Sequence, residues 1–304
     1  MQAAPGTTTA DRPGTVRSLP RLLSCIRFDE VLVLQGSPLL GAVFSIGRLT
    51  TERAVALLFL AAGSCCLVAH VFVLNDWSGM SADLQDPNKT TGVFMTKGIG
   101  RTEIGYLWMA LLALSLLLLS PFGSRTLFIA LAIAGLSALY SAPGPHMKGV
   151  PLLSSGLHLV GGILYFLLGY SLFSAVDGRG LEIGCFFALA FVAGHLTHEA
   201  RDCESDLLNG IRTNAVTFGK ARTLAAGFAL FTIADILLVV LAARGTVPRP
   251  LVFVAALYPV HLYWSLQTLR AGLTFESIRA LQVRYRALYA TIGLMMVVTV
   301  LLAH

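Results

Sequence analysis

Charged residues are scarce in this chain. Lys, Arg, Asp and Glu make up only 12% of its 304 residues, whereas hydrophobic residues make up 56% and the mean hydropathy is +0.75. Soluble globular domains carry roughly 25% charged residues, so this composition excludes an ordinary soluble protein. It indicates an integral membrane protein.

Cysteine is sparse as well, and its spacing excludes a zinc or disulfide framework. The five cysteines lie in or beside apolar segments without a metal-ligand spacing: Cys25, Cys65, Cys66, Cys185 and Cys203. This placement is typical of packing residues. The glycines of residues 92–100 form neither a G-x-x-x-x-G-K-[ST] nor a G-x-G-x-x-G pattern, so this segment is neither a P-loop nor a Rossmann fingerprint.

The chain contains many long apolar runs. A transmembrane helix needs about 20 mostly apolar residues, and nine runs fit: 30–47, 54–74, 104–122, 126–142, 152–175, 181–199, 222–243, 250–268 and 286–303. Their spacing leaves no room for a separate soluble domain. We therefore predict an all-α membrane protein with nine transmembrane helices, in which residues 23–304 form one domain. Residues 1–22 are polar, lack the apolar core of a signal peptide, and are expected to form a disordered cytoplasmic tail.

The positions of Lys and Arg favour one orientation. With the N-terminus in the cytoplasm, sixteen of the 22 basic residues fall on the cytoplasmic side. The other six fall outside: Arg48, Arg53, Arg125, Arg179, Arg244 and Arg249. This asymmetry fits the positive-inside rule with the C-terminus outside, and we take the membrane to be the bacterial cytoplasmic membrane. Nucleic acid is not needed to explain the net charge of +6. The basic, amphipathic segment 270–286 is suited to lying on anionic headgroups.

An acidic cluster follows the sixth apolar run, in the segment GHLTHEARDCESDLLNGIRTNAVTFG of residues 194–219. A spacing of four puts Asp202 and Asp206 on one helical face. Two carboxylates that close repel unless a cation lies between them, and beside a phosphorylated substrate that cation is most often Mg²⁺. A solvated acidic helix end is the alternative. His195 and Glu199 precede the pair by one to two turns and are candidates for a base, because ionisable groups near the membrane are commonly functional. A zinc site at His195 and His198 is disfavoured, because no further ligand has a suitable spacing.

A second acidic cluster follows the second apolar run and reads NDWSGMSADLQDPNK. Asn75, Gly79 and Asp83 recur at a spacing of four, so Asn75 and Asp83 share a face if the helix continues two turns past Leu74. Two oxygen-rich faces at the mouths of two helices predict a site for a divalent metal and a diphosphate. The prediction requires both mouths to open on the same side of the membrane.

Basic residues lie near both clusters, and a phosphate site normally needs them. We expect the diphosphate to be bound by Lys97, Arg101, Tyr140, Lys148, Arg201 and Arg212. For Tyr140 and Lys148, anchoring at the membrane interface is an equally good explanation. The two acidic clusters each follow the second helix of a set of four, which suggests two diverged four-helix repeats plus one helix, with the site between the repeats.

At these residues the chain resembles the UbiA superfamily of intramembrane prenyltransferases. The first motif of that family is commonly N-D-x-x-D-x-x-x-D. Asn75, Asp76 and Asp83 match it, and Gly79 replaces an aspartate. The second motif, D-x-x-x-D followed by G-[IV], matches at Asp202, Asp206, Gly210 and Ile211, and a Y-S-x-P…K-x-x-P element matches at Tyr140, Ser141, Pro143, Lys148 and Pro151.

The resemblance implies nine transmembrane helices around a central cavity and an Mg²⁺-dependent reaction of a polyprenyl diphosphate. The metal ligands it implies are Asn75, Asp76, Asp83, Asp202 and Asp206. The expected function is transfer of a prenyl group from an allylic diphosphate to a small aromatic or quinone-like acceptor, with Asn75, Asp83, Asp202, Asp206, His195 and Glu199 as the catalytic residues. Gly79 and His195 depart from the usual family pattern, so two alternatives stay open. One is a class I terpene cyclase that uses the same donor, and the other is a membrane transporter or lipid-binding scaffold.

Overall fold

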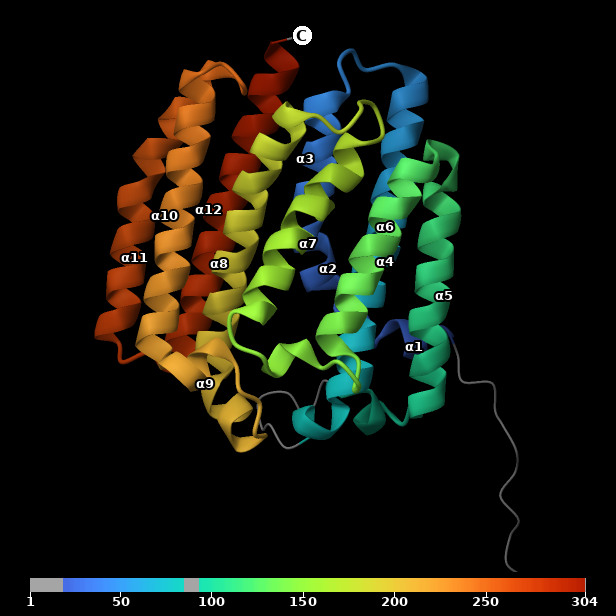
Figure 1. Ribbon diagram of the computed structural model, residues 1–304, viewed down its shortest axis with the longest axis vertical. Coiled ribbons are helices and arrows are strands. Elements are labelled where there is room, and N and C mark those ends of the chain that lie inside the picture. The colour runs from blue at the N-terminus through green and yellow to red at the C-terminus, as the bar shows by residue number, and fades with distance from the viewer. Residues whose placement is uncertain (1–18, 85–92, 304) are drawn as a thin grey trace, which may run out of the picture.

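The computed structural model describes residues 19–84 and 93–303, apart from the side chains of residues 81 and 82. These residues form helices and turns, with no strand among them. Figure 1 shows long helices running side by side in a bundle. Seven described helices are long and apolar enough to cross a membrane: α4 (Thr51–Asp83), α5 (Arg101–Leu119), α6 (Ser124–Ser141), α7 (Leu153–Tyr170), α8 (Gly178–Leu208), α10 (Lys220–Ala243) and α12 (Phe275–Leu302). The prediction of an all-α integral membrane protein is confirmed.

Two of the nine predicted spans consist of shorter helices. The first is divided at Gln35 into α2 (Phe28–Leu34) and α3 (Gly36–Ser45). The buried Gln35 amide donates to the Val31 carbonyl at 2.9 Å, and its oxygen accepts from Ser64 Oγ at 2.5 Å. Gln35 is therefore a satisfied packing residue at a helix break. The eighth span begins as a 3₁₀ segment, η5 (Arg249–Leu257), and continues as α11 (Tyr258–Arg270).

Two surface segments differ from expectation. Of the predicted disordered tail, residues 1–18 lie outside the described residues, and the rest begins the short helix α1 (Leu19–Leu23). The basic segment 270–286 is not a separate surface helix. It contains the turn after α11 and the first part of α12, which runs without a break to Leu302. Its charges therefore lie where a spanning helix leaves the membrane.

Helix α8 holds the bundle together, because it packs against α7, α10 and α12. Its start is fixed by Asp177, whose Oδ1 accepts from the Gly180 N–H at 2.8 Å and from the Tyr170 hydroxyl at 3.1 Å. The hydrogen bond from Gly180 lowers the pKa of the Asp177 carboxyl, so this cap is ionised at neutral pH. Its stabilising effect is complete above the pKa of an unfolded aspartate and is lost as the pH falls through the lower folded-state pKa.

Helices α3 and α7 pack backbone against backbone. A Cβ placed on Gly169 would lie 1.7 Å from the Pro38 carbonyl oxygen, and one placed on Gly41 would lie 2.1 Å from the Phe166 carbonyl oxygen. Only glycine permits this approach, as is common between membrane helices. The contact fixes α7, which carries part of the candidate site, against the broken first span.

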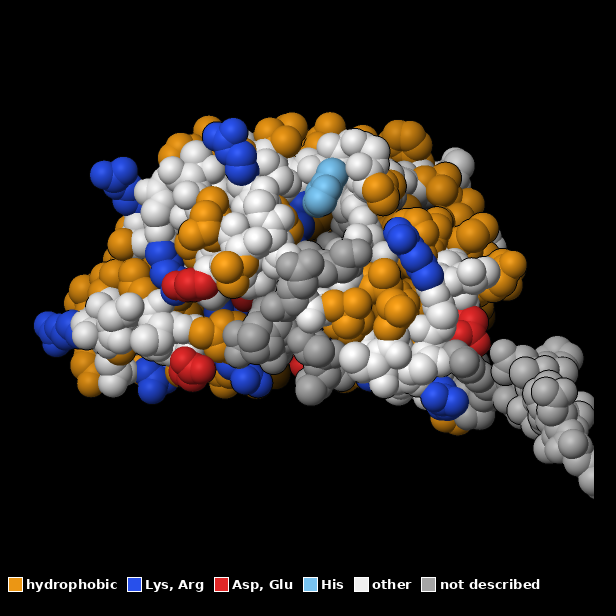
Figure 2. Space-filling model, turned by 90° about the horizontal axis from the view of Figure 1, so that it is seen from below, with side chains coloured by type: hydrophobic (Ala, Val, Ile, Leu, Met, Phe, Trp, Pro, Cys, Tyr) orange, Lys and Arg blue, Asp and Glu red, His pale blue; other side chains and the backbone are white. Residues whose placement is uncertain are grey.

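The chain connects its spans so that α4, α6 and α8 all end at the same end of the bundle, opposite the C-terminus (Figure 1). Short elements cover this end: η2 (Phe94–Lys97), η4 (Met147–Gly149) and α9 (Asn214–Phe218). Seen from below, basic and acidic side chains are spread over this end and its outline, with hydrophobic side chains between them (Figure 2). We call it the active end.

Candidate active site

The last three turns of α8 carry one polar stripe: His195, Glu199, Asp202 and Asp206. Their spacings of four, three and four place them one above another on a helix. His195, Glu199 and Asp206 are buried, at 8%, 5% and 4% exposure. Buried ionisable groups need partners, and each of these has one.

Glu199 is held by donors from three segments. Its Oε2 accepts from the backbone N–H and the side-chain amide of Asn214, at 3.0 and 2.8 Å. Its Oε1 accepts from Ser154 Oγ at 3.3 Å and lies 3.1 Å from His195 Nε2. A carboxylate with this many donors is stabilised in its ionised form. Glu199 is thus better suited to orienting its neighbours than to removing a proton.

Tyr140, at the end of α6, lies beside this stripe. Its ring meets His158 of α7 edge-on at a centroid distance of 4.9 Å and His195 at 6.2 Å. The end of α6 is therefore brought to the acidic stripe of α8.

The loop between α6 and α7 supplies a cation to the same place. Lys148 Nζ lies 3.9 Å from Asp206 Oδ1. Beside it, a Cβ added to Gly149 would lie 3.9 Å from the Arg212 backbone nitrogen and from the Ile211 side chain, both in the loop after α8. Arg212 itself is exposed on that loop. Lys148 is thus placed at the acidic stripe, and the backbone of Arg212 adjoins it.

The first acidic cluster lies on the last turns of α4, which continues to Asp83 as the spacing requires. Asn75 Oδ1 accepts from Ser141 Oγ at 3.3 Å, so this face meets the end of α6 next to Tyr140. Asp83 lies on the same face, and a Cβ on Gly79 would be 3.7 Å from its Oδ2. Both acidic faces therefore end at the active end of the bundle, with the end of α6 between them (Figure 1).

Asp76 points to a different neighbour from Asn75, because adjacent residues on a helix differ by about 100° in direction. Its carboxylate accepts two hydrogen bonds from Arg27, one of them from Nε at 3.1 Å. Burial raises the pKa of the nearby Cys25 thiol, and Asp76 adds to this effect while Lys97 opposes it. The predicted metal ligand Asp76 thus pairs with the segment before α2.

Two predicted diphosphate residues are engaged in the same region. Lys97 Nζ donates to the Ser24 carbonyl at 2.6 Å. The Arg101 guanidinium lies over the Trp77 ring, 4.5 Å from its centroid. Lys97 connects η2 to the N-terminal segment, and Arg101 connects the start of α5 to α4. They adjoin the first acidic cluster, whereas Lys148 adjoins the second.

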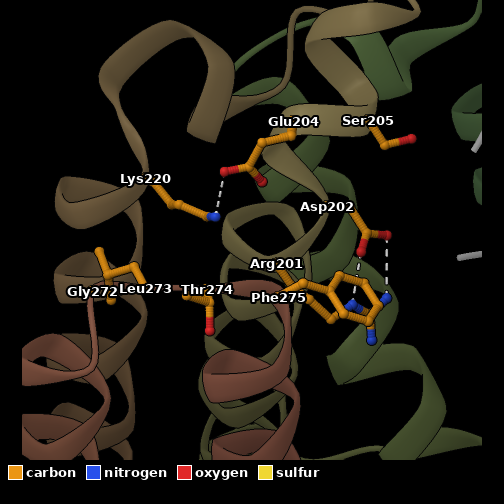
Figure 3. A pocket seen from close by; sticks show the side chains of 9 residues that line it. All are labelled: Arg201, Asp202, Glu204, Ser205, Lys220, Gly272, Leu273, Thr274 and Phe275. Carbon is orange, nitrogen blue, oxygen red and sulfur yellow. Dashed lines mark hydrogen bonds and ion pairs between the residues drawn. The ribbon is translucent and has the colours of Figure 1, made fainter. Parts of the chain in front are cut away.

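Asp202 faces Arg201, which binds it through two hydrogen bonds of 2.7 and 3.1 Å. Arg201 also donates to Gln282 of α12 at 2.8 Å. Beside this pair lies a pocket of about 340 Å³, lined by the end of α8, the start of α10 and the turn before α12 (Figure 3). On its far side Lys220 pairs with Glu204 at 2.6 Å, which keeps Glu204 off the acidic stripe.

Three residues of this arrangement are not singled out by the sequence patterns. Asn214 and Ser154 bind Glu199, and Arg27 binds Asp76. Ser154 is four residues before His158 on α7, and Asn214 begins α9, so neither belongs to an acidic motif. Among the described residues, no three of His, Cys, Asp or Glu are grouped as a preformed metal cluster.

Comparisons with known proteins agree on one family. The sequence model of the UbiA prenyltransferase family matches residues 37–302. A UbiA homolog from Archaeoglobus fulgidus, solved with GPP and Mg²⁺, superposes with a TM-score of 0.66 at 18% identity, over 90% of this chain and 99% of that one. A UbiA homolog from Aeropyrum pernix K1 gives 0.68 at 15% identity, over 89% and 98%.

A third solved structure is described as a digeranylgeranylglyceryl phosphate synthase. It superposes with a TM-score of 0.68 at 17% identity, over 93% of this chain and 98% of that one. A search of curated proteins gives no match. At these identities the structural likeness shows the fold, and the family rests on the sequence model.

Proposed function

The chain belongs to the UbiA prenyltransferase family, and from this premise we propose that it is an Mg²⁺-dependent membrane prenyltransferase. Its donor would be an allylic polyprenyl diphosphate and its acceptor a small aromatic or quinone-like molecule. The observation that carries the proposal is that two oxygen-rich faces, on α4 and α8, both lie at one end of the bundle, beside the end of α6. A related UbiA homolog was solved with GPP and Mg²⁺, which supports the donor class.

The donor set suits Mg²⁺. Asn75, Asp83, Asp202 and Asp206 offer amide and carboxylate oxygens, which are the ligands this ion prefers. Mg²⁺ keeps several waters and shares its other positions with substrate phosphates, so a preformed protein cluster is not required. Arginines already bind both carboxylate oxygens of two predicted ligands: Arg27 binds Asp76, and Arg201 binds Asp202. A metal ion would share these two carboxylates with a guanidinium group.

The residues of the site would have different roles in the reaction. When bound, Mg²⁺ would offset negative charge on the diphosphate as the allylic C–O bond breaks. Lys148 and Arg201 are placed beside Asp206 and Asp202 to stabilise the leaving diphosphate, which is favourable where charge develops in the transition state. Lys97, Arg101 and Arg212 are secondary candidates, and Tyr140 contributes a hydroxyl beside the acidic stripe. The apolar bundle excludes water from the carbocation.

We also place this end of the bundle in the cytoplasm and the C-terminus outside, in a bacterial cytoplasmic membrane. The broken segment α2–α3 and the segment η5–α11 would complete nine membrane passes with the seven long helices. Two diverged four-helix repeats around a central cavity would then meet at the site. The charge distribution supports the proposed orientation, and the resemblance to the family supports the nine passes and the repeats.

One assay tests the proposal. Purified protein in nanodiscs receives geranyl, farnesyl or geranylgeranyl diphosphate with Mg²⁺, and pyrophosphate release is measured with and without an aromatic acceptor. Asp206→Asn and Asp202→Asn are each expected to lose about 10²–10³-fold in rate, the usual cost of removing one such electrostatic group. Glu204→Gln is the matched control, since Glu204 is 70% exposed and lies off the stripe. Removal of Mg²⁺ with EDTA is expected to stop turnover.

Other outcomes would decide against the proposal. A cyclic hydrocarbon or alcohol formed without an acceptor would identify a terpene cyclase. Absence of turnover with every donor would leave a transporter or scaffold. Wild-type rates in both aspartate variants would rule out Asp202 and Asp206 as residues of the active site.

A further inference from the structure

Two histidine rings stack at the inner side of the candidate site. The His158 and His195 rings are nearly parallel, at 11°, with centroids 3.7 Å apart. They come from different helices, α7 and α8, and Tyr140 of α6 meets both rings edge-on. Burying two imidazoles this close disfavours protonation of both, because a second positive charge would be unshielded. At most one of the two rings therefore carries a positive charge at a time, and the two histidines are not equivalent.

His195 is fixed by the ionised Glu199. Its Nε2 lies 3.1 Å from Glu199 Oε1, and the other carboxylate oxygen is taken by Asn214. This close contact with a carboxylate orients the His195 ring. His195 is 8% exposed, and its ring contacts His158 and Tyr140. It is placed to orient its neighbour.

His158 is bound through its Nδ1 atom, whereas His195 contacts Glu199 through Nε2. Its Nδ1 lies 2.8 Å from the Ser154 carbonyl oxygen. A carbonyl only accepts, so the hydrogen of a neutral His158 is on Nδ1, and Nε2 carries the lone pair. On α7, His158 shares the inward face with the buried residues Ser154, Gly161 and Tyr165, yet its ring keeps an accessible edge. It therefore offers a basic nitrogen inside the bundle.

The groups packed around His158 come from α6 and α8. Tyr140 of α6 touches its ring edge-on. The ionisable groups that act on His158 are His195 and His198 of α8, and a positive charge on either of them would oppose a positive charge on His158. His198 also contacts Arg286 of α12 at 3.2 Å. From α8, Phe191 packs on the ring without charge.

The geometry points to His158 as the residue that accepts the proton of the reaction, with His195 and Glu199 as positioning residues. This inference rests on the proposed function. The electron pair of the allylic C–O bond leaves with the diphosphate, and an acceptor ring carbon bonds to the allylic carbon. The ring hydrogen then leaves as a proton to the Nε2 lone pair of His158, and its bonding pair restores the aromatic ring. The imidazolium formed returns its proton to water when the product leaves.

Two isosteric variants separate the roles. His158→Asn keeps a side-chain N–H close to the Nδ1 position for the Ser154 carbonyl and removes the Nε2 lone pair. His195→Gln keeps an amide N–H close to the Nε2 position for Glu199 and removes the stacked ring. For each variant, pyrophosphate release and prenylated acceptor are measured in the same reaction, with Tm as a check on folding.

His158→Asn is expected to keep pyrophosphate release within about threefold of wild type and to lower the prenylated fraction at least tenfold, with prenyl alcohol in its place. The reason is that an arenium ion that cannot lose its proton reverts, and water captures the cation. His195→Gln is expected to lower both readouts together. Uncoupling by His195→Gln and not by His158→Asn would overturn the assignment, as would unchanged product ratios in both. Wild-type protein that ionises no donor would instead overturn the proposed function, and this inference with it.

A second measurement does not depend on turnover. ¹⁵N spectra of histidine-labelled protein, compared with those of His158→Asn, identify the His158 ring among seven histidines. The Nδ1–H tautomer is expected at neutral pH. An Nε2–H tautomer would leave no lone pair at Nε2 and would overturn the inference.

Discussion

Asn214 is the side chain that joins the segments of the active end. Its amide oxygen accepts from the Leu152 N–H at 2.8 Å, and its amide nitrogen donates to Glu199 at 2.8 Å and to Ser155 at 3.1 Å. Leu152 has a φ of 64°, which costs energy for a residue other than glycine. The hydrogen bond from its N–H helps to hold that conformation, so one asparagine fixes both the loop before α7 and the orientation of Glu199.

Asn214→Ala is accordingly expected to lower the free energy of unfolding by about 2–3 kcal/mol, because a buried carboxylate loses a donor. Thermal unfolding in detergent micelles measures the change. Asn209→Ala is the matched control, since the Asn209 amide donates to the backbone oxygen of Ser205 within its own helix end. Equal shifts in the two variants would show that Asn214 does not join these segments.

Single residues also show where sequence reasoning reaches its limit. The spacing of four correctly placed Asp202 with Asp206 and Asn75 with Asp83, because the period of a helix is fixed. The neighbouring Asp76 could not be assigned in this way. Its partner is Arg27, which is 49 positions away in the sequence. Asn214 and Ser154 likewise gain their roles only when α7, α8 and α9 are folded together.

At the scale of elements, apolar length predicted the seven long helices, whereas two of the nine runs consist of shorter elements. A hydropathy pattern cannot detect the hydrogen bonds at the helix break. Gln35 donates to the Val31 carbonyl and accepts from Ser64 of α4. The same applies to η5, whose apolar residues form a 3₁₀ segment before α11. The contact of α3 with α7 joins segments far apart in the chain, so the sequence pattern does not identify Pro38 as the neighbour of Gly169.

That contact provides a direct test of the element packing. Gly169→Ala is expected to prevent folding or to cost more than about 3 kcal/mol, because overpacking against a rigid backbone cannot relax locally. Gly156→Ala, on the same helix, is the control. No atom lies within 4 Å of its added Cβ, so it is expected to be neutral or to stabilise by up to about 1 kcal/mol. Expression and Tm in detergent compare the two variants, and similar Tm values would contradict the close approach of α3 and α7.

At the scale of the whole molecule, the two ends of the bundle differ in charge. The end that carries the C-terminus holds the six basic residues assigned to the outside. Two of them link its loops, since Arg179 donates to the Thr246 carbonyl at 3.1 Å and Arg53 lies 5.9 Å from the Phe173 ring. The active end holds the paired cations, among them Lys148, Lys220 and Arg286. A surplus of basic residues at one end favours its retention in the cytoplasm.

Two single-cysteine variants test this orientation. Gly178 begins α8 at the C-terminal end of the bundle, and Gly144 lies between α6 and η4 at the active end. Both are exposed, and no atom lies within 4 Å of an added Cβ at either position. In a background without the five native cysteines, a membrane-impermeant maleimide is expected to label Gly178→Cys in intact cells. Gly144→Cys is expected to react only after permeabilisation. The reverse pattern would put the diphosphate site outside the cell, where a cytoplasmic prenyl diphosphate could not reach it without transport.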